Sequence, residues 1–205
     1  MRDSIGRSGG HARRIRLFTV RTLREILRDP LSFVICLGVP LVLLVAMYAL
    51  FSPTEPWFTL DMLTPGIAVF SGAFAMLYMA LLVSRDRATW FLTRLYSSPL
   101  TDGDFVLGYA LPGILIGAGQ LVICWAASAV TGLVAGETAW LGVGILPAVL
   151  SALPMVVCFV FIGILSGSLF SDKAAPGLSS VVISGAGFLS GAWMPVESLS
   201  EGFRT

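Results

Sequence analysis

The sequence predicts an all-α integral membrane protein with about five transmembrane helices. Of its 205 residues, 56% are hydrophobic and only 12% are charged, whereas soluble domains carry roughly 25% charged residues. The charges are also segregated: uncharged runs cover 30–54, 62–84, 105–136, 138–171 and 174–196. About 20 apolar residues cross a hydrocarbon core of ~30 Å, so each run is long enough for one helical span.

The N-terminal region reads as two parts that precede the first span. Residues 1–11 are rich in Gly, Ser and Arg, and we expect a disordered basic tail. Residues 12–29 predict an amphipathic interfacial helix, because apolar and basic side chains fall on opposite arcs. The apolar arc holds Ile15, Phe18, Leu23, Ile26 and Leu27, and the basic arc holds Arg14, Arg21, Arg24 and Arg28. This composition is typical of a helix lying on anionic lipid.

Residues 30–196 form the predicted transmembrane domain, with spans at about 31–51, 63–83, 105–135, 145–170 and 176–193. Pro30 follows Asp29 and suits the first position of a helix, while Pro40 lies inside the first span and is expected to kink it. Glycines four residues apart predict close helix packing in lipid. These pairs are Gly113/Gly117, Gly132/Gly136, Gly163/Gly167 and Gly187/Gly191.

The basic residues set the orientation. Of the 13 Lys and Arg residues, all but Arg204 fall on the same side of the five predicted spans. Cytoplasmic loops carry the excess of Lys and Arg, so we expect a multi-pass membrane protein with its N-terminus in the cytoplasm. Residues 197–205 are then an outward-facing end.

A charged island at 85–104 separates the second and third spans. Residues 88–96 predict a short amphipathic helix that Pro99 ends, and Thr101 with Asp104 predicts the capped start of the next helix. Two interpretations are open: an ordinary solvated loop with one interfacial turn, or a docking element for a partner outside the membrane.

Several kinds of chemistry are missing from the sequence. No ionisable side chain lies inside the uncharged runs, which argues against a proton- or sodium-coupled carrier. Gln120 is the most polar residue well inside a span, and it could contact a cargo or bond a neighbouring helix. A phosphate-binding loop needs a Lys after a Gly-rich turn, and the single lysine, Lys173, follows Asp172. We therefore expect no catalytic residues, no metal site, no cofactor bound by this chain and no nucleic-acid partner.

Four strings then resemble the permease of an ABC-2 type transporter, and they cover roughly residues 15–203. They are TVRTLREILRDPLSFVICLGVPLVLLV, LTPGIAVFSGAF, SRDRATWFLTRLYSSPLTDGDFVLGYALPG and FLSGAWMPVESL. The closest similarity is to the bacterial drug- or lipid-export branch, which implies a location in the bacterial cytoplasmic membrane. The resemblance implies six spans, so the sixth span is absent from a sequence that ends at Thr205.

The resemblance also implies partners and a site. It implies a homodimer or heterodimer with a second permease, and cytoplasmic ATP-binding-cassette ATPase subunits that hold ATP-Mg and contact the segment between spans two and three. The coupling residues in this segment are then Arg85, Asp86, Arg87, Trp90, Arg94, Ser98 and Pro99.

The leading hypothesis from the sequence is a permease subunit of an ABC exporter that moves an amphiphilic or apolar cargo and is not itself an enzyme. A secondary or passive transporter, and a membrane scaffold that moves nothing, are the alternatives.

Overall fold

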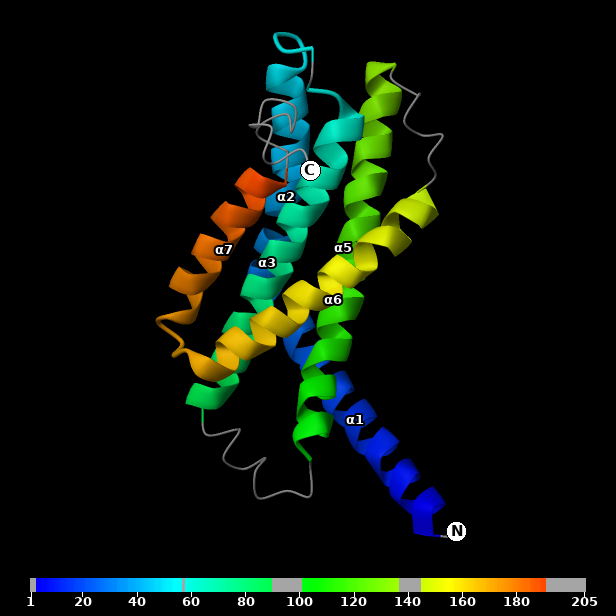
Figure 1. Ribbon diagram of the computed structural model, residues 1–205, viewed down its shortest axis with the longest axis vertical. Helices are drawn as coiled ribbons and strands as arrows, with labels where there is room; N and C mark the ends of the chain where they lie inside the picture. The colour runs from blue at the N-terminus through cyan, green and yellow to red at the C-terminus, as the bar shows by residue number, and fades with distance from the viewer. Residues whose placement is uncertain (1–2, 57, 90–100, 137–144, 191–205) are drawn as a thin grey trace, which may run out of the picture.

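The computed structural model describes residues 3–56, 58–89, 101–136 and 145–190, and within these ranges the regular secondary structure is helical (Figure 1). The helices are α1 (Asp3–Arg28), α2 (Pro30–Phe51), α3 (Leu60–Ala88), α5 (Asp102–Ala135), α6 (Ile145–Leu169) and α7 (Ala175–Leu189). The predicted all-α membrane fold is confirmed.

Four helices, α2, α3, α5 and α6, are long and apolar enough to cross a membrane. They lie where the first four spans were predicted, and α2 begins at Pro30 as expected. The fifth predicted span, 176–193, coincides with α7, an apolar helix of 15 residues that ends at Leu189. Residues 191–193 of that span lie outside the described ranges.

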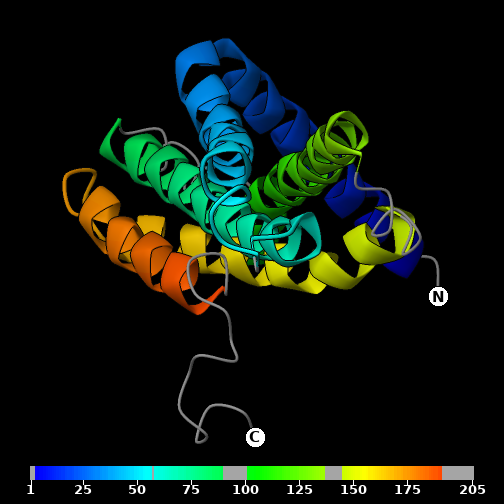
Figure 2. The ribbon, with the colours of Figure 1, turned by 90° about the horizontal axis from the view of Figure 1, so that it is seen from above.

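The bundle is organised around α3. Seen from above, α1 and α2 lie on one side of α3, and α6 and α7 lie on the other (Figure 2). α3 contacts α2, α5, α6 and α7, and 72% of its span is buried, compared with 22% for α2, 33% for α5 and 28% for α6. The apolar outer surfaces of these three helices suit lipid, since apolar side chains cost nothing to expose there.

Glycines make the closest helix contacts. A Cβ added at Gly163 or Gly167 of α6 would lie 2.5 Å from the backbone oxygen of Met76 or Ala80 in α3. In α5, a Cβ on Gly117 would lie 2.5 Å from Val156 of α6. Small residues allow helices to approach this closely in lipid, so the packing predicted for Gly163/Gly167 and Gly113/Gly117 is confirmed.

The pair Gly132/Gly136 behaves differently from the prediction. Gly132 is buried, but Gly136 is exposed and ends α5 in the left-handed conformation, with φ 78°. Glycine adopts this conformation without the steric cost that a Cβ brings. Gly136 is therefore a helix terminator and not a packing residue. For Gly187/Gly191, Gly187 is buried and Gly191 lies outside the described residues.

The N-terminal helix differs from the sequence prediction in two ways. α1 begins at Asp3, so most of the segment 1–11, expected to be disordered, is helical. The predicted arcs also do not separate lipid from solvent: Phe18 and Ile26 are buried within the protein, whereas Leu27 is 60% exposed. α1 packs against α5, and side-chain contacts with that helix and with α3 decide its orientation.

The charged island begins inside a helix. α3 continues past the predicted end at residue 83 to Ala88, so the charged residues 85–87 occupy its last turn, and Thr89 caps it. The predicted start of the next helix is confirmed: the backbone N–H of Asp104 donates to Thr101 Oγ1 over 3.4 Å, and the N–H of Thr101 donates to Asp104 Oδ2 over 3.2 Å. Residues 90–100, which hold most of the predicted amphipathic helix, lie outside the described ranges.

Candidate functional site at the charged end of the bundle

Asp86 is the centre of a buried polar cluster that joins three helices. Its side chain lies in the last turn of α3, and the residue is only 3% exposed. Arg21 of α1 donates from Nη1 to Asp86 Oδ2 over 2.8 Å and from Nη2 to Oδ1 over 3.3 Å. The hydroxyl of Tyr109 in α5 also donates to Oδ2. A buried carboxylate needs such partners, because an unpaired charge in the interior costs several kcal/mol.

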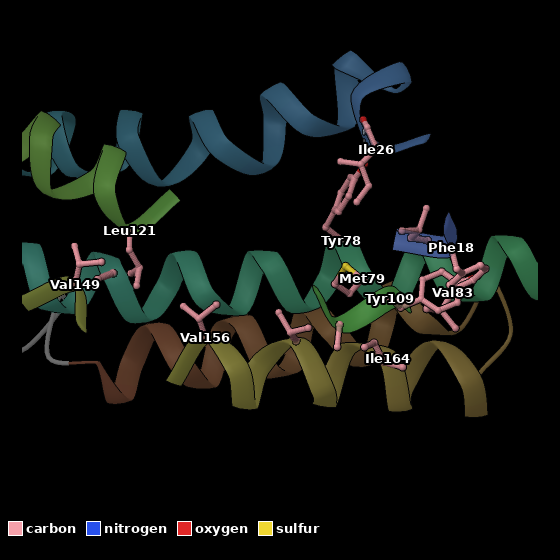
Figure 3. Close-up of a cluster of buried hydrophobic side chains, with 14 residues drawn as sticks. Phe18, Ile26, Tyr78, Met79, Val83, Tyr109, Leu121, Val149, Val156 and Ile164 are labelled. Atoms are coloured by element: carbon pink, nitrogen blue, oxygen red, sulfur yellow. Dashed lines mark hydrogen bonds between the residues drawn. The ribbon is translucent and has the colours of Figure 1, made fainter. Parts of the chain in front are cut away.

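Aromatic packing places these partners. Phe18, one turn before Arg21 on α1, meets the ring of Tyr109 edge-on, with centroids 5.0 Å apart at 88°. The ring of Phe18 fits because it lies over Gly108, where a Cβ would collide with it. Figure 3 shows Phe18, Val83 and Tyr109 gathered at this point. The apolar contact therefore fixes α1 on α5 and brings the guanidinium of Arg21 to Asp86.

Glu25 extends the cluster along α1. Its Oε2 lies 2.7 Å from Nη2 of Arg21. Burial lowers the pKa of Arg21, but the hydrogen bond to Asp86 and the charge of that carboxylate outweigh burial, so the pKa stays above its ordinary value. Burial and the charge of Asp86 raise the pKa of Glu25 in spite of its contact with Arg21. Arg21 is therefore firmly cationic, and Glu25 holds its proton more tightly than a solvated glutamate does.

A second ion pair holds α1 nearer its N-terminus. Nε of Arg14 lies 3.4 Å from Oδ2 of Asp104, whose side chain is 2% exposed. The same carboxylate caps the start of α5 through Thr101, where a negative charge is favoured by the helix dipole. Arg14 and Arg21, predicted to face away from the apolar arc, thus turn inward because two buried carboxylates lie there.

The two arginines beside Asp86 bond other elements. Nη1 of Arg85 lies 3.3 Å from Oδ2 of Asp29, at the junction of α1 and α2. Arg87 donates to the backbone oxygens of Ser168 and, over 2.8 Å, of Phe170. The last carbonyls of a helix have no partner within it, so Arg87 satisfies the end of α6 from α3.

The structure thus brings together Arg85, Asp86 and Arg87 of the predicted coupling residues, and each bonds within the chain. The carboxylate of Asp86 points inward and is not presented on the surface. Trp90, Arg94, Ser98 and Pro99 lie outside the described residues, so the docking role of the segment stays a prediction.

Sequence reasoning missed Arg21 and Tyr109 as partners of Asp86, and Arg14 as the partner of Asp104. The signal was present: Asp86 lies between two arginines at a membrane boundary, and a buried acid there requires donors from other helices.

Gln120 lies in a separate polar contact between α5 and α2. Its Nε2 donates to the backbone oxygen of Cys36 over 3.0 Å, and the residue is 3% exposed. Inside an α-helix this oxygen would accept from the N–H four residues later, but that residue is Pro40, which has no N–H. Gln120 replaces the missing donor, which corresponds to the helix-bonding interpretation.

Gln120 also borders a cavity of about 10 Å³ between α2, α3 and α5, which has room for at most one water. A contact with cargo stays a prediction.

Among the described residues, no three His, Cys, Asp or Glu side chains gather in a way that could hold a metal ion. The fold and the site define a multi-pass helical membrane protein whose described basic residues gather at one end of the bundle. The chain belongs to the ABC-2 type transporter family, whose family model it matches over residues 13–205. It is therefore a membrane permease component of an ABC transporter, in a family whose permeases are not themselves catalytic. No curated protein and no solved structure matches the chain.

Proposed function

We propose that this chain is the permease subunit of an ABC exporter, moving an amphiphilic or apolar cargo with ATP hydrolysed by a separate cytoplasmic ATPase subunit. In this proposal it works as a homodimer or heterodimer with a second permease, and its N-terminus lies in the cytoplasm of a bacterial cell. The observation that carries the proposal is the last turn of α3, where three consecutive charged residues bond three different parts of the bundle directly before the predicted docking segment.

This arrangement gives a route for mechanical coupling. A displacement of the segment after Thr89 acts first on the end of α3. Arg85 transmits it to the α1–α2 junction, Asp86 to α1 and α5, and Arg87 to the end of α6. Asp86 is the buried member of these links, and removing one partner of a buried ion pair costs about 3–5 kcal/mol, so its bond to Arg21 favours movement of α1 and α3 together over breakage of the contact. The bonds of Arg85 and Arg87 are exposed and hold their partners more weakly.

The proposed cargo class follows from the polarity of the bundle. The buried hydroxyls of Thr64 and Ser128 bond each other at 2.5 Å between α3 and α5, and Gln120 bonds α2. The exposed faces of α2, α5 and α6 are apolar. Such surfaces favour an apolar or amphiphilic cargo over an ion, since an ion in a membrane protein needs charged or polar ligands along its path.

The decisive experiment is reconstitution of the chain with a candidate ATP-binding-cassette ATPase subunit, using a fluorescent amphiphile inside vesicles as the probe. Efflux that requires ATP is expected. Efflux without the ATPase would favour a passive or secondary transporter, and a complex that forms without any efflux would favour a scaffold.

A variant tests the coupling route within that assay. Arg87→Gln removes the link to α6, so we expect ATPase co-purification to persist while ATP-driven efflux falls severalfold. Lys173→Gln, an exposed charge beyond the end of α6, is the matched control. Unchanged efflux in Arg87→Gln would exclude this link from coupling.

The docking surface needs a separate variant. Trp90→Ala combined with Arg94→Ala is expected to leave membrane insertion normal and to weaken ATPase co-purification tens-fold, because aromatic and Arg side chains dominate binding hot spots. Undiminished co-purification would place the docking surface elsewhere.

Orientation is tested by labelling. In a variant without native cysteines, a cysteine at Thr54 should react with an impermeant thiol reagent in intact cells, whereas cysteines at Ser8 and Ser97 should not. Labelling of Ser97 from outside would reverse the proposed topology.

A further inference from the structure

The outward face of α1 combines basic and aliphatic side chains that the rest of the bundle does not use. Between residues 12 and 28, the exposed arginines are Arg13, Arg16, Arg24 and Arg28. Between them on the same arc lie three aliphatic residues that are also exposed: Leu17 at 63%, Val20 at 39% and Leu27 at 60%. At 100° per residue these seven positions fall within one third of the helix circumference, opposite buried Phe18, Thr22 and Ile26.

The charges of α1 are divided between its two faces. The other two arginines of this stretch, Arg14 and Arg21, bond the buried carboxylates of Asp104 and Asp86. The only acid of residues 12–28, Glu25, lies beside Arg21 on that inner side. The outward arc therefore carries four cations and no acidic residue of its own. This arc is therefore a basic surface that can attract an anionic partner.

We propose that this outward face of α1 binds the headgroups of anionic phospholipids in the leaflet on its own side of the membrane. The arginines hold the phosphates, and Leu17, Val20 and Leu27 enter the upper acyl region beneath them. This lipid is a structural ligand and not the transported cargo, so the proposal stands whether or not the exporter function is correct.

The position of α1 favours lipid over an acidic protein surface. Only Asp29 separates α1 from α2, a helix able to span the membrane. Leu27 is thus three residues from the start of that helix, which places its exposed side chain at headgroup depth. Arg side chains lay their aliphatic stems along apolar surface and keep the guanidinium in the polar layer, so Arg and aliphatic residues on one arc can both be accommodated at the membrane interface. Figure 1 shows that α1 leaves the base of the bundle obliquely and that its N-terminal part extends away from the other helices.

The effect of charge removal can be estimated. Each basic residue near an anionic surface contributes about 1 kcal/mol, which is roughly fivefold in affinity. Arg16→Gln combined with Arg24→Gln should therefore raise the concentration of phosphatidylglycerol needed for half-saturation roughly thirtyfold. Arg16→Lys combined with Arg24→Lys keeps the charge and is the matched control. All of these side chains are exposed, so neither pair disturbs the core.

The test uses the full chain with a spin label on a cysteine at Val20, in a variant lacking the native cysteines. The chain is reconstituted in vesicles of phosphatidylcholine, with increasing phosphatidylglycerol, and label depth is measured from its accessibility to oxygen and to a water-soluble nickel chelate. We expect the label to move deeper as phosphatidylglycerol is added, with the shift weakened at 1 M salt, where charges are screened beyond ~3 Å. The shift should persist in the Lys variant and vanish in the Gln variant at moderate phosphatidylglycerol.

Equal depth in neutral and anionic vesicles, or an unchanged shift in the Gln variant, would overturn the proposal. Protection of the label only after addition of the ATPase subunit would assign the face to a protein instead.

Discussion

Gln120 and Pro40 form a pair whose energies are predicted to be interdependent. Gln120→Leu removes the donor to the Cys36 carbonyl with little change in volume. Because Pro40 cannot supply an N–H, this buried oxygen is then left without its partner. Unsatisfied buried groups cost about 1–3 kcal/mol, and hydrogen bonds between membrane helices average about 0.6 kcal/mol with a maximum near 1.7. We therefore expect Gln120→Leu to lower the free energy of unfolding by about 1–2 kcal/mol.

Pro40→Ala restores an amide N–H at the position that an α-helix uses for that carbonyl. In this background Gln120→Leu should cost less than about 0.5 kcal/mol, because α2 then satisfies its own oxygen. The assay is a double-mutant cycle by SDS-induced unfolding in mixed micelles, followed by circular dichroism. The expected coupling is about 1 kcal/mol or more, above the ~0.3–0.5 kcal/mol within which independent sites add. Additive losses would refute the view that Gln120 substitutes for the missing N–H.

Three further predictions concern stability. Asp86→Asn should lower the free energy of unfolding by about 2–3 kcal/mol, because it removes the buried counter-charge of Arg21 and leaves only the half-buried Glu25 beside it. Asp61→Asn, exposed at the other end of α3, should have little effect in the same SDS titration, and equal effects would contradict the assignment. Glu25 has a pKa raised above its ordinary 4.5, so the folded state binds the Glu25 proton more tightly than the unfolded state does. The free energy of unfolding therefore falls as pH rises through the window from about 4.5 to the raised pKa. In melting curves collected across pH, Glu25→Gln should flatten this fall and be at least as stable as wild type above that window. Gly167→Ala should lower the free energy of unfolding by about 2 kcal/mol because the added Cβ meets the backbone of α3, whereas Gly119→Ala has nothing within 4 Å of its Cβ and should be neutral or gain up to ~1 kcal/mol from helix propensity. Similar stabilities of the two variants would contradict the packing argument.

Hydropathy and charge segregation predicted the spans because the membrane imposes a minimum apolar length on every crossing helix. The same pattern could not orient α1. A helical wheel places Arg14 and Arg21 away from the apolar arc, and only the presence of Asp86 and Asp104 on neighbouring helices shows that these arginines face inward. Gln120 was open to two interpretations for a similar reason, since its partner is a carbonyl freed by a proline 80 positions earlier in the chain. Local periodicity contains no information about such long-range partners.

The glycine seam between α3 and α6 also limits how the two helices can slide. In the present register, Phe159 lies on Gly72, Gly163 on Met76 and Gly167 on Ala80. A shift of one turn toward the start of α3, about 5.4 Å, would bring Gly163 onto Gly72 and Gly167 onto Met76, again with small residues in contact. The opposite shift would force the ring of Phe159 onto Met76. Because the two glycines are four residues apart, one turn of a helix, whole-turn shifts keep a glycine of α6 against the backbone of α3, as in the one-turn ratchets of other switching proteins.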